Sequence, residues 1–330
     1  MDADVAIVGA GFAGLAAARE LRWLGRSAIV LEARDRIGGR TWTDERLGTV
    51  LELGGTWVHW LQAHVWTEVT RYGLETVATP WPDQVIWIAG GERRFGNMDE
   101  YVALFAKAAE RLMADAMDVF PFPFTPFANL ELAAIDRFSI ADRVESCGFT
   151  KDERDFVLAV LASNLSADPA DAALTHLLRV ASLSGSIDKL DEVTTGYRLA
   201  GGTRSLAGAI ARDARVDVRL STDVIAIDHE EGEAVLQTSV GDRITARVVI
   251  VTVPIDALRR IEFRPKLSPS KRQVASRGQA SRGVKAWARV RGVEEPFSPL
   301  RLPPPPWRLC NRWARSMVIR SSSVSGPTQS

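Results

Sequence analysis

The sequence predicts a mixed α/β protein, built on a parallel sheet and interrupted by a largely helical insertion. Three observations lead to this class. An apolar strand, a glycine-rich turn, a helix and a second apolar strand follow one another between Val5 and Leu31, which is the order of a nucleotide-binding βαβ unit. Residues from about 80 to 190 then read as helices, and short apolar strands return after residue 197. We therefore expect a Rossmann-like domain that is discontinuous in sequence, with a second domain inserted into it.

The turn after the first strand carries glycine at the spacing Gly-x-Gly-x-x-Gly, at Gly9, Gly11 and Gly14. The first glycine permits the tight bend, the second lets a pyrophosphate approach the backbone, and the third lets the helix pack close to the sheet. The free N–H groups of the helix N-terminus attract phosphate. Glu32 ends the second strand at the distance where an acid accepts hydrogen bonds from a ribose. This context predicts a dinucleotide site.

Two further glycine pairs indicate which dinucleotide is bound. The first lies in Gly38-Gly39-Arg40 and the second in Leu51-Glu52-Leu53-Gly54-Gly55-Thr56-Trp57. A nicotinamide enzyme needs no second glycine pair, so a nicotinamide-dependent dehydrogenase is the disfavoured alternative. Adjacent glycines let more backbone approach an extended ligand, and Arg40 adds a cation beside its phosphates.

These three glycine sites resemble those of the flavin-containing amine oxidases, a family that joins monoamine, polyamine and L-amino-acid oxidases and their bacterial relatives. The resemblance runs from about Asp4 to about Phe297 and implies FAD as the cofactor. It implies that the pyrophosphate lies on the first turn, the adenosine ribose on Glu32, adenine against the Val224 backbone, and the flavin ring beside Gly54 to Trp57. The cofactor-binding residues that it implies are Gly9, Gly11, Phe12, Ala13, Gly14, Glu32, Ala33, Arg34, Gly38, Gly39, Arg40, Thr41, Gly54, Gly55, Thr56, Trp57, Val224, Val253 and Pro254.

Periodicity predicts the remaining elements in chain order. A helix is expected at 63–73 and a strand at 85–88, followed by a hairpin turn, and a long helix is expected at 97–118. The stretch 120–127 alternates Phe and Pro, so we expect a loop whose rings pack on the core. Further helices are predicted at 139–147, 150–164, 170–184 and 205–212, and strands at 216–220, 223–227, 234–239, 243–246 and 248–253.

Together these elements predict a discontinuous FAD-binding domain at 1–80 plus 197–260. The substrate domain is expected at 81–196 plus 261–298, and its helical part matches the insertion found in the family. Residues 299–330 are predicted to be an irregular, out-of-frame tail.

Two residues are candidates for catalysis. Lys285 lies in an apolar strand, Val284 to Val290, where a charged side chain is unexpected unless it has a function. The family resemblance implies that it holds a water for the oxygen half-reaction, and the alternative is a surface lysine at a sheet edge. His59 follows the third glycine pair, and some polyamine oxidases have a similar run with a histidine close to the substrate amine. A neutral imidazole there could take a proton from an ammonium group, whereas the alternative is a hydrogen-bonded loop histidine.

The resemblance implies oxidation of a small-molecule amine to an imine, which hydrolyses to a carbonyl compound and ammonia or an amine, with oxygen reduced to hydrogen peroxide. Because such chemistry needs few acids and bases, the protein's share is to bind, orient and exclude water. The alternative from another class is a non-catalytic or decayed flavoprotein fragment of the same family.

Composition excludes several other classes. The formal net charge is zero over 330 residues, and the excess of Lys and Arg between Arg259 and Arg320 lacks nucleic-acid-binding motifs, so no nucleic-acid partner is predicted. Two cysteines and four histidines form no set with metal-ligand spacing, so no metal is predicted. No apolar run reaches the roughly 18 residues of a membrane span. We expect a cytoplasmic protein, and no pattern specifies an oligomeric state.

The end of the sequence departs from the family. Family members continue past the point matched by Phe297 with strands, an aromatic substrate wall and a last glycine-rich flavin segment, whereas this chain continues with Pro303 to Pro306 and an Arg- and Ser-rich tail. We predict that the C-terminal part of the fold is missing, with weak FAD retention and negligible turnover. A divergent but genuine tail is the alternative.

Overall fold

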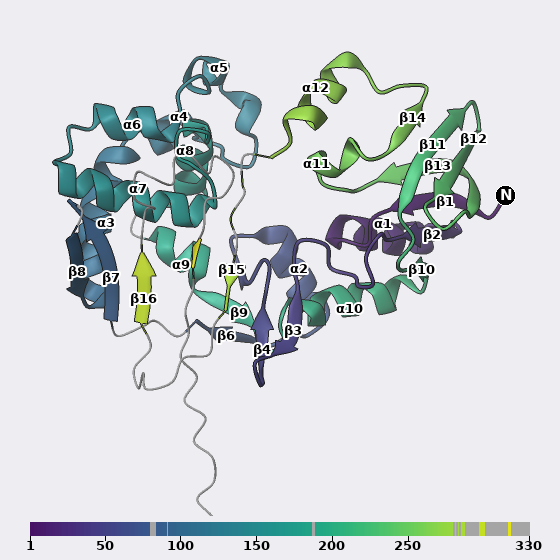
Figure 1. The fold of residues 1–330 in the computed structure, drawn as a ribbon, viewed down its shortest axis with the longest axis horizontal. Helices are drawn as coiled ribbons and strands as arrows, with labels where there is room; N and C mark the ends of the chain where they lie inside the picture. The colour runs from purple at the N-terminus through teal and green to yellow at the C-terminus, as the bar shows by residue number, and fades with distance from the viewer. Residues whose placement is uncertain are drawn as a thin grey trace, which may run out of the picture. The chain divides into compact units, whose positions relative to one another are not determined.

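The computed structural model describes residues 1–79, 84–90, 92–186, 189–279, 281, 283, 285–287, 297–300 and 316–317. It divides into two compact units (Figure 1). The first comprises 1–57, 63–77 and 198–279, and the second comprises 58–62, 78–197 and 280–330. The predicted domains differ from these units mainly in two segments: 58–62, predicted in the FAD-binding domain, belongs to the second unit, and 261–279, predicted in the substrate domain, belongs to the first. The reason for the second difference is strand pairing: β14 (Glu262–Arg264) joins the main sheet beside β11 (Val224–Glu230).

The first unit is built on a seven-stranded sheet in the order β10-β2-β1-β13-β12-β11-β14. Strands β10, β2, β1 and β13 run parallel, whereas β12 is antiparallel to both of its neighbours. The mixed α/β class with a parallel core is therefore confirmed. The bounds are β1 Ala3–Val8, α1 Phe12–Trp23, β2 Ala28–Leu31, β3 Thr43–Arg46, β4 Thr49–Glu52, α2 Ala63–Arg71, α10 Thr203–Ala214, β10 Asp217–Arg219, β12 Glu233–Thr238, β13 Arg243–Val251, α11 Ile255–Leu258 and α12 Pro269–Arg277.

Strand β13 corrects one prediction. The sequence predicted two strands there, a hairpin strand at 243–246 and a buried strand at 248–253, but the chain stays extended through both. Its first part pairs antiparallel with β12 up to Ala246, and from Ala246 onward it pairs parallel with β1 (Figure 1). Because one strand exchanges partners without a turn, it connects the antiparallel strands to the parallel core. The core between them is apolar and includes Ala6, Leu31, Leu236 and Ala246.

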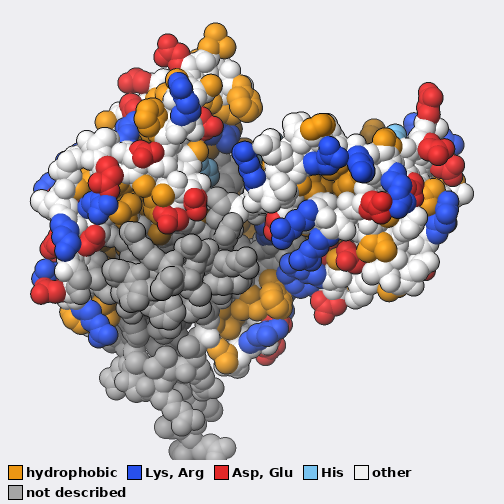
Figure 2. Space-filling model, turned by 45° about the horizontal axis from the view of Figure 1, so that its top comes forward, with side chains coloured by type: hydrophobic (Ala, Val, Ile, Leu, Met, Phe, Trp, Pro, Cys, Tyr) orange, Lys and Arg blue, Asp and Glu red, His pale blue; other side chains and the backbone are white. Residues whose placement is uncertain are grey.

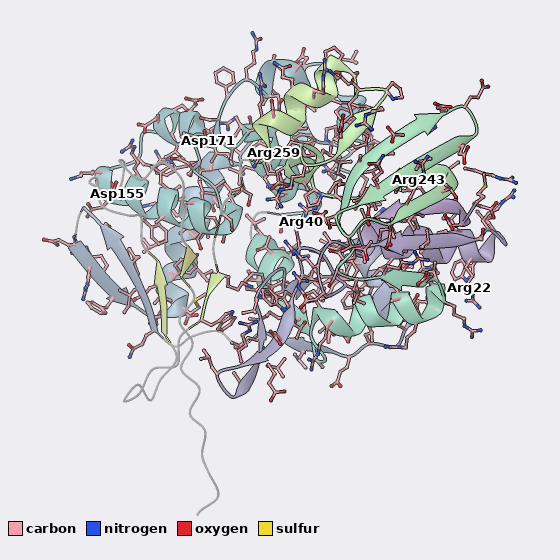
Figure 3. All side chains as sticks on the ribbon, turned by 45° about the vertical axis from the view of Figure 1, so that its right-hand side comes forward. Arg22, Arg40, Asp155, Asp171, Arg243 and Arg259 are labelled. Carbon is pink, nitrogen blue, oxygen red and sulfur yellow. The ribbon has the colours of Figure 1, made fainter. Side chains whose placement is uncertain are left out.

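Helices α1 and α10 pack on each other, and α1 also contacts β2. The buried face of α1 presents Leu15 and Ala18. Arg22 of α1 donates from Nη1 to the carbonyl oxygen of Asp213 in α10 at 2.6 Å (Figure 3). The helix is also tied to α2, because the buried Arg19 is paired with Glu68. These contacts fix the helix whose N-terminus faces the glycine turn.

The second unit is mainly helical. Its bounds are β7 Gln84–Ala89, β8 Glu92–Gly96, α3 Met98–Leu112, α4 Ala116–Val119, η1 Pro126–Ala128, α5 Leu132–Ile135, α6 Ile140–Ser146, α7 Lys151–Leu165, α8 Leu174–Leu183, α9 Leu190–Thr195, β15 Lys285–Ala286, β16 Phe297–Leu300 and β17 Ser316–Met317. Capping boxes start α3 at Asn97 and α7 at Thr150, and the latter was predicted. Three of the five points where the chain passes from one unit to the other fall inside short strands, β5 Trp57–Val58, β6 Thr76–Ala78 and β9 Tyr197–Leu199.

Two predictions in this unit were wrong. The long helix at 97–118 is divided into α3 and α4, separated by a short turn. The phenylalanines of the loop at 120–127 were expected on the core, but only Phe120 is buried, and Phe127 is 87% exposed. Phe-Pro alternation excludes a helix without specifying which way the rings point. Most of the apolar strand predicted around Lys285, and of the tail, lies outside the described residues.

Charged side chains are mixed over the surface. Figure 2 shows acidic and basic groups interspersed, with hydrophobic side chains between them. Among the described residues, no helix is long and apolar enough to cross a membrane. In the same part of the chain, no group of three or more His, Cys, Asp or Glu residues could hold a metal ion.

Candidate functional site

The first glycine turn, between β1 and α1, has the geometry that its spacing predicts. Gly9 adopts φ +104°, a conformation that residues with side chains rarely take. A Cβ on Gly14 would lie 1.9 Å from the carbonyl oxygen of Gly9, so helix and turn could not approach with any larger residue there. A Cβ on Gly11 would meet only the Cα of Gly39, at 3.9 Å. Gly14 is therefore required by packing, whereas Gly11 borders open space, as a site for an approaching pyrophosphate requires.

Backbone N–H groups of the first glycine turn and of the segment after β2 hold the Glu32 carboxylate. Its side chain is buried, and Oε2 accepts the N–H of Ala10 at 2.7 Å while Oε1 accepts the N–H of Arg34 at 3.0 Å. A carboxylate has about four lone-pair positions, so each oxygen retains capacity to accept from a ribose hydroxyl. The acid is fixed in place before any ligand arrives.

The second glycine pair lies against the first turn. Gly38 donates its N–H to the carbonyl oxygen of Ala10 at 2.9 Å, and both Gly38 and Gly39 have positive φ. A Cβ on Gly39 would come within 3.2 Å of the Cα of Gly11. Gly11 and Gly39 therefore face each other across bare backbone, so the two glycine motifs that the sequence places 28 positions apart form one surface.

An arginine that the sequence analysis missed supports this loop. Arg36 donates from its guanidinium to the carbonyl oxygens of Thr41 at 2.8 Å and Gly39 at 3.0 Å, and it stacks over Trp42. Burial lowers the pKa of Arg36, and the nearby Arg34 charge lowers it further. Arg40, the predicted phosphate partner, is exposed on the loop after β2 (Figure 3). Arg36 shapes the loop, whereas Arg34 and Arg40 are its exposed cations.

The third glycine pair packs on the second. A Cβ on Gly54 would lie 2.2 Å from the carbonyl oxygen of Arg40, and Gly55 donates its N–H to that oxygen at 3.1 Å. Position 54 therefore has to be glycine, because the backbone there packs directly against the backbone at Arg40. Thr56 donates to the carbonyl oxygen of Gly54, and Trp57 is 37% exposed. The role of this segment beside a flavin ring stays a prediction.

Two residues at the carboxyl end of β13 complete the turn. Thr252, which the sequence analysis missed, donates its hydroxyl to the carbonyl oxygen of Val8 at 2.9 Å. Val253 has a methyl carbon 3.5 Å from the position that a Cβ on Gly9 would occupy. Of the other predicted contacts, Pro254 is half-buried, and the Val224 side chain belongs to the core. A polar residue inside the apolar run 248–253 was the signal that could have identified Thr252.

Glu52 organises the start of α10. Its carboxylate accepts the Thr43 hydroxyl and the N–H of Thr203, both at 2.7 Å, and the Thr203 hydroxyl at 2.9 Å. A negative charge is favourable at a helix N-terminus. Glu52 is half-buried between Leu51 and Leu53, and the sequence gives no signal of this role because Thr203 is 151 positions away.

His59 belongs to a separate cluster in the second unit, formed with Trp60, Glu192 and Tyr197 (the histidine cluster). The His59 side chain is 1% exposed, and its ring centroid lies 3.7 Å from that of Trp60. Its Nδ1 accepts the N–H of Leu61 at 3.1 Å, and its Nε2 has no hydrogen-bond partner among the described residues. Oε1 of Glu192 is 3.9 Å from Nε2. Burial lowers the pKa of His59, although the Glu192 charge opposes the shift.

Lys285, the other catalytic candidate, lies in β15 of the second unit. This strand pairs parallel with β17, with Lys285 opposite Ser316, and the lysine is half-buried. Both catalytic candidates therefore lie outside the unit that carries the glycine turns.

Comparison with known proteins identifies the family. A model of the flavin-containing amine oxidoreductases matches residues 12–305. The chain is 34% identical over 296 residues to pseudooxynicotine dehydrogenase of a Pseudomonas species, covering 88% of this chain and 59% of that protein. It is 35% identical over 294 residues to nicotine dehydrogenase of Pseudomonas putida, covering 88% and 61%. The chain belongs to the flavin-containing amine oxidoreductase family, as its glycine motifs predicted.

Solved structures agree with this family. A putrescine oxidase bound to putrescine matches with a TM-score of 0.69 at 27% identity, over 84% of this chain and 63% of that one. Cyclohexylamine oxidase from Brevibacterium oxydans matches with a TM-score of 0.67 at 26% identity, over 84% and 63%. The chain thus spans about three-fifths of the length of the curated relatives named above. FAD is the cofactor that the family implies, and the bare backbone at Gly11 and Gly39 fits it.

Proposed function

We propose that the protein is an FAD-dependent amine oxidoreductase that converts an amine to an imine, which then hydrolyses to a carbonyl compound. The single observation that carries the cofactor assignment is the backbone surface at Gly11, where a Cβ would meet only the Cα of Gly39, next to the buried Glu32. Family membership supports the assignment of an amine as the substrate. Bound FAD would supply the acceptor for the two electrons and the hydride equivalent.

The chain's own residues contribute binding and orientation. The N–H groups at the start of α1 would hold the pyrophosphate, since a helix leaves its first N–H groups without intrahelical partners. Glu32 would accept the ribose hydroxyls while its two backbone donors keep the carboxylate from turning. For Lys285 we retain the predicted role of holding a water in the oxygen half-reaction.

The electron acceptor distinguishes two forms of this function. The sequence analysis predicted oxygen, with hydrogen peroxide as the product. Two relatives at 34% and 35% identity are named dehydrogenases, and this favours a second candidate in which the electrons leave to an acceptor other than oxygen.

The test begins with FAD-reconstituted full-length chain, scored for visible flavin absorbance. Putrescine, cyclohexylamine and nicotine are then added without oxygen, and bleaching of the flavin band is recorded. We expect bleaching by at least one amine. Peroxide release on admitting air supports oxygen as the acceptor, whereas turnover only with a redox dye supports the dehydrogenase form. Stoichiometric flavin that no amine bleaches would contradict amine oxidation and favour a non-catalytic flavoprotein.

A further inference from the structure

The hydrogen bonds of His59 define its tautomer. A neutral imidazole has one donor and one acceptor nitrogen. Nδ1 is the acceptor here, because it receives the N–H of Leu61. Nε2 therefore carries the hydrogen and can only donate. This differs from the predicted role of His59 as a proton acceptor, which would need the Leu61 contact to break.

The donor lies near a carboxylate that it does not reach. Nε2 and Oε1 of Glu192 are 3.9 Å apart, longer than the roughly 2.9 Å of a hydrogen bond. If one ligand atom made hydrogen bonds to both Nε2 and Oε1, with a tetrahedral angle between the two bonds, these two atoms would be about 4.6 Å apart. Because Nε2 is closed to solvent, that atom can enter only if a neighbouring side chain moves, and the partly exposed Glu192 side chain is one that can move outward. A shift of less than about 1 Å is enough, and this side chain is 46% exposed.

The bridging atom has to accept from Nε2–H and donate to Glu192. A hydroxyl oxygen or a neutral amine nitrogen meets both conditions, whereas an ammonium has no lone pair and a quaternary nitrogen has neither group. A nitrogen held in this way has its lone pair engaged. Oxidation of a C–N bond to an imine draws on that lone pair, so the group bound here is a second polar group of the substrate.

We propose that His59 and Glu192 form a specificity subsite for the non-reacting hydroxyl or amine of a bifunctional amine. The assignment rests on the proposed function, because it names the class of amine that this family member takes. The Trp60 ring lies 5.3 Å from Tyr197 by centroids, and it is 44% exposed. The exposed part of the Trp60 ring gives the carbon chain of such a substrate an apolar surface. Glu192 carried no sequence signal, since it lies in a short polar helix.

Calorimetric titration of the full-length chain tests the subsite without any electron transfer. The ligands are 4-aminobutan-1-ol, butylamine and (4-aminobutyl)trimethylammonium. We expect the amino alcohol to bind about fivefold or more tightly than butylamine, as one net hydrogen bond gives. The quaternary compound should bind no better than butylamine. Glu192→Ala should remove the preference, whereas Glu110→Ala, an exposed acid on α3, should keep it.

His59→Phe should also remove the preference. If this variant does not fold, Glu192→Ala and Glu192→Gln decide, because the glutamine amide retains an acceptor oxygen and should keep part of the preference. Equal binding of alcohol and amine, no measurable binding, tighter binding of the quaternary compound, or a preference that survives in Glu192→Ala would each overturn the subsite. If the amino alcohol is preferred but no amine bleaches the flavin, the subsite is supported and the proposed function is contradicted. If an amine bleaches the flavin but the amino alcohol is not preferred, the proposed function is supported and the subsite is contradicted.

Discussion

In the glycine turns of the first unit the surface that we propose to face a ligand is backbone, whereas in the histidine cluster of the second unit it is made of side chains. At Gly11 and Gly39 the feature that matters is an absent Cβ. At His59 it is the direction of one N–H and its distance from Glu192. Backbone surfaces are specified by local sequence spacing, but side-chain clusters depend on which distant segments meet. The glycine surface could be predicted from the sequence. In the histidine cluster the sequence predicted His59 but not Glu192.

The largest effect is expected at Gly14, where the turn is constrained by packing. Gly14→Val places a Cβ 1.9 Å from the carbonyl oxygen of Gly9, so the helix has to move away from the sheet. We expect a loss of about 3 kcal/mol or more in the free energy of unfolding. Urea denaturation followed by circular dichroism measures this loss. Unchanged stability would show that α1 and the turn are not in this contact.

The next effect is expected at Glu52, which anchors the start of α10. Glu52→Ala leaves the N–H of Thr203 and two hydroxyls without their acceptor. Loss of the cap and of these bonds should cost about 2 kcal/mol. Glu45→Ala, an exposed acid on β3, serves as the control and should be nearly neutral. Equal melting temperatures for the two variants would refute the anchoring role.

The smallest effect concerns the pH dependence of stability at His59. Burial lowers its pKa in the folded protein below the ordinary value of 6.5, so the unfolded chain binds the proton more readily. His59 therefore contributes stability that is fully present above pH 6.5 and is lost as the pH falls through its folded pKa. His59→Asn should reduce the slope of unfolding free energy against pH in that range. His64→Asn, at an exposed position, should leave it unchanged.

The glycine positions and Glu32 were predictable because each motif has a local physical reason. Helix and strand types were largely predictable too, as the capping box at Thr150 illustrates. The side chains of Phe122 and Phe127 were not, because a loop pattern does not specify which surface its rings contact. Neither was the continuity of β13, which depends on its exchange of partners from β12 to β1.

The site shows the same division. His59 was found from its position after the third glycine pair, but its tautomer depends on the N–H of Leu61 and its partner is Glu192, 133 positions away. Thr252 was missed because a single polar residue in an apolar strand has many explanations.

The central claim is that bare backbone at Gly11 receives the FAD pyrophosphate. Titration of FAD into the wild type and into Gly11→Val, followed by visible absorbance, tests it most directly. Since a Cβ on Gly11 would meet only the Cα of Gly39, at 3.9 Å, the variant should keep its fold by circular dichroism. It should lose FAD binding by about 100-fold or more, the size of two or more lost hydrogen bonds to a charged group. A folded Gly11→Val protein that binds FAD as tightly as the wild type would contradict the account.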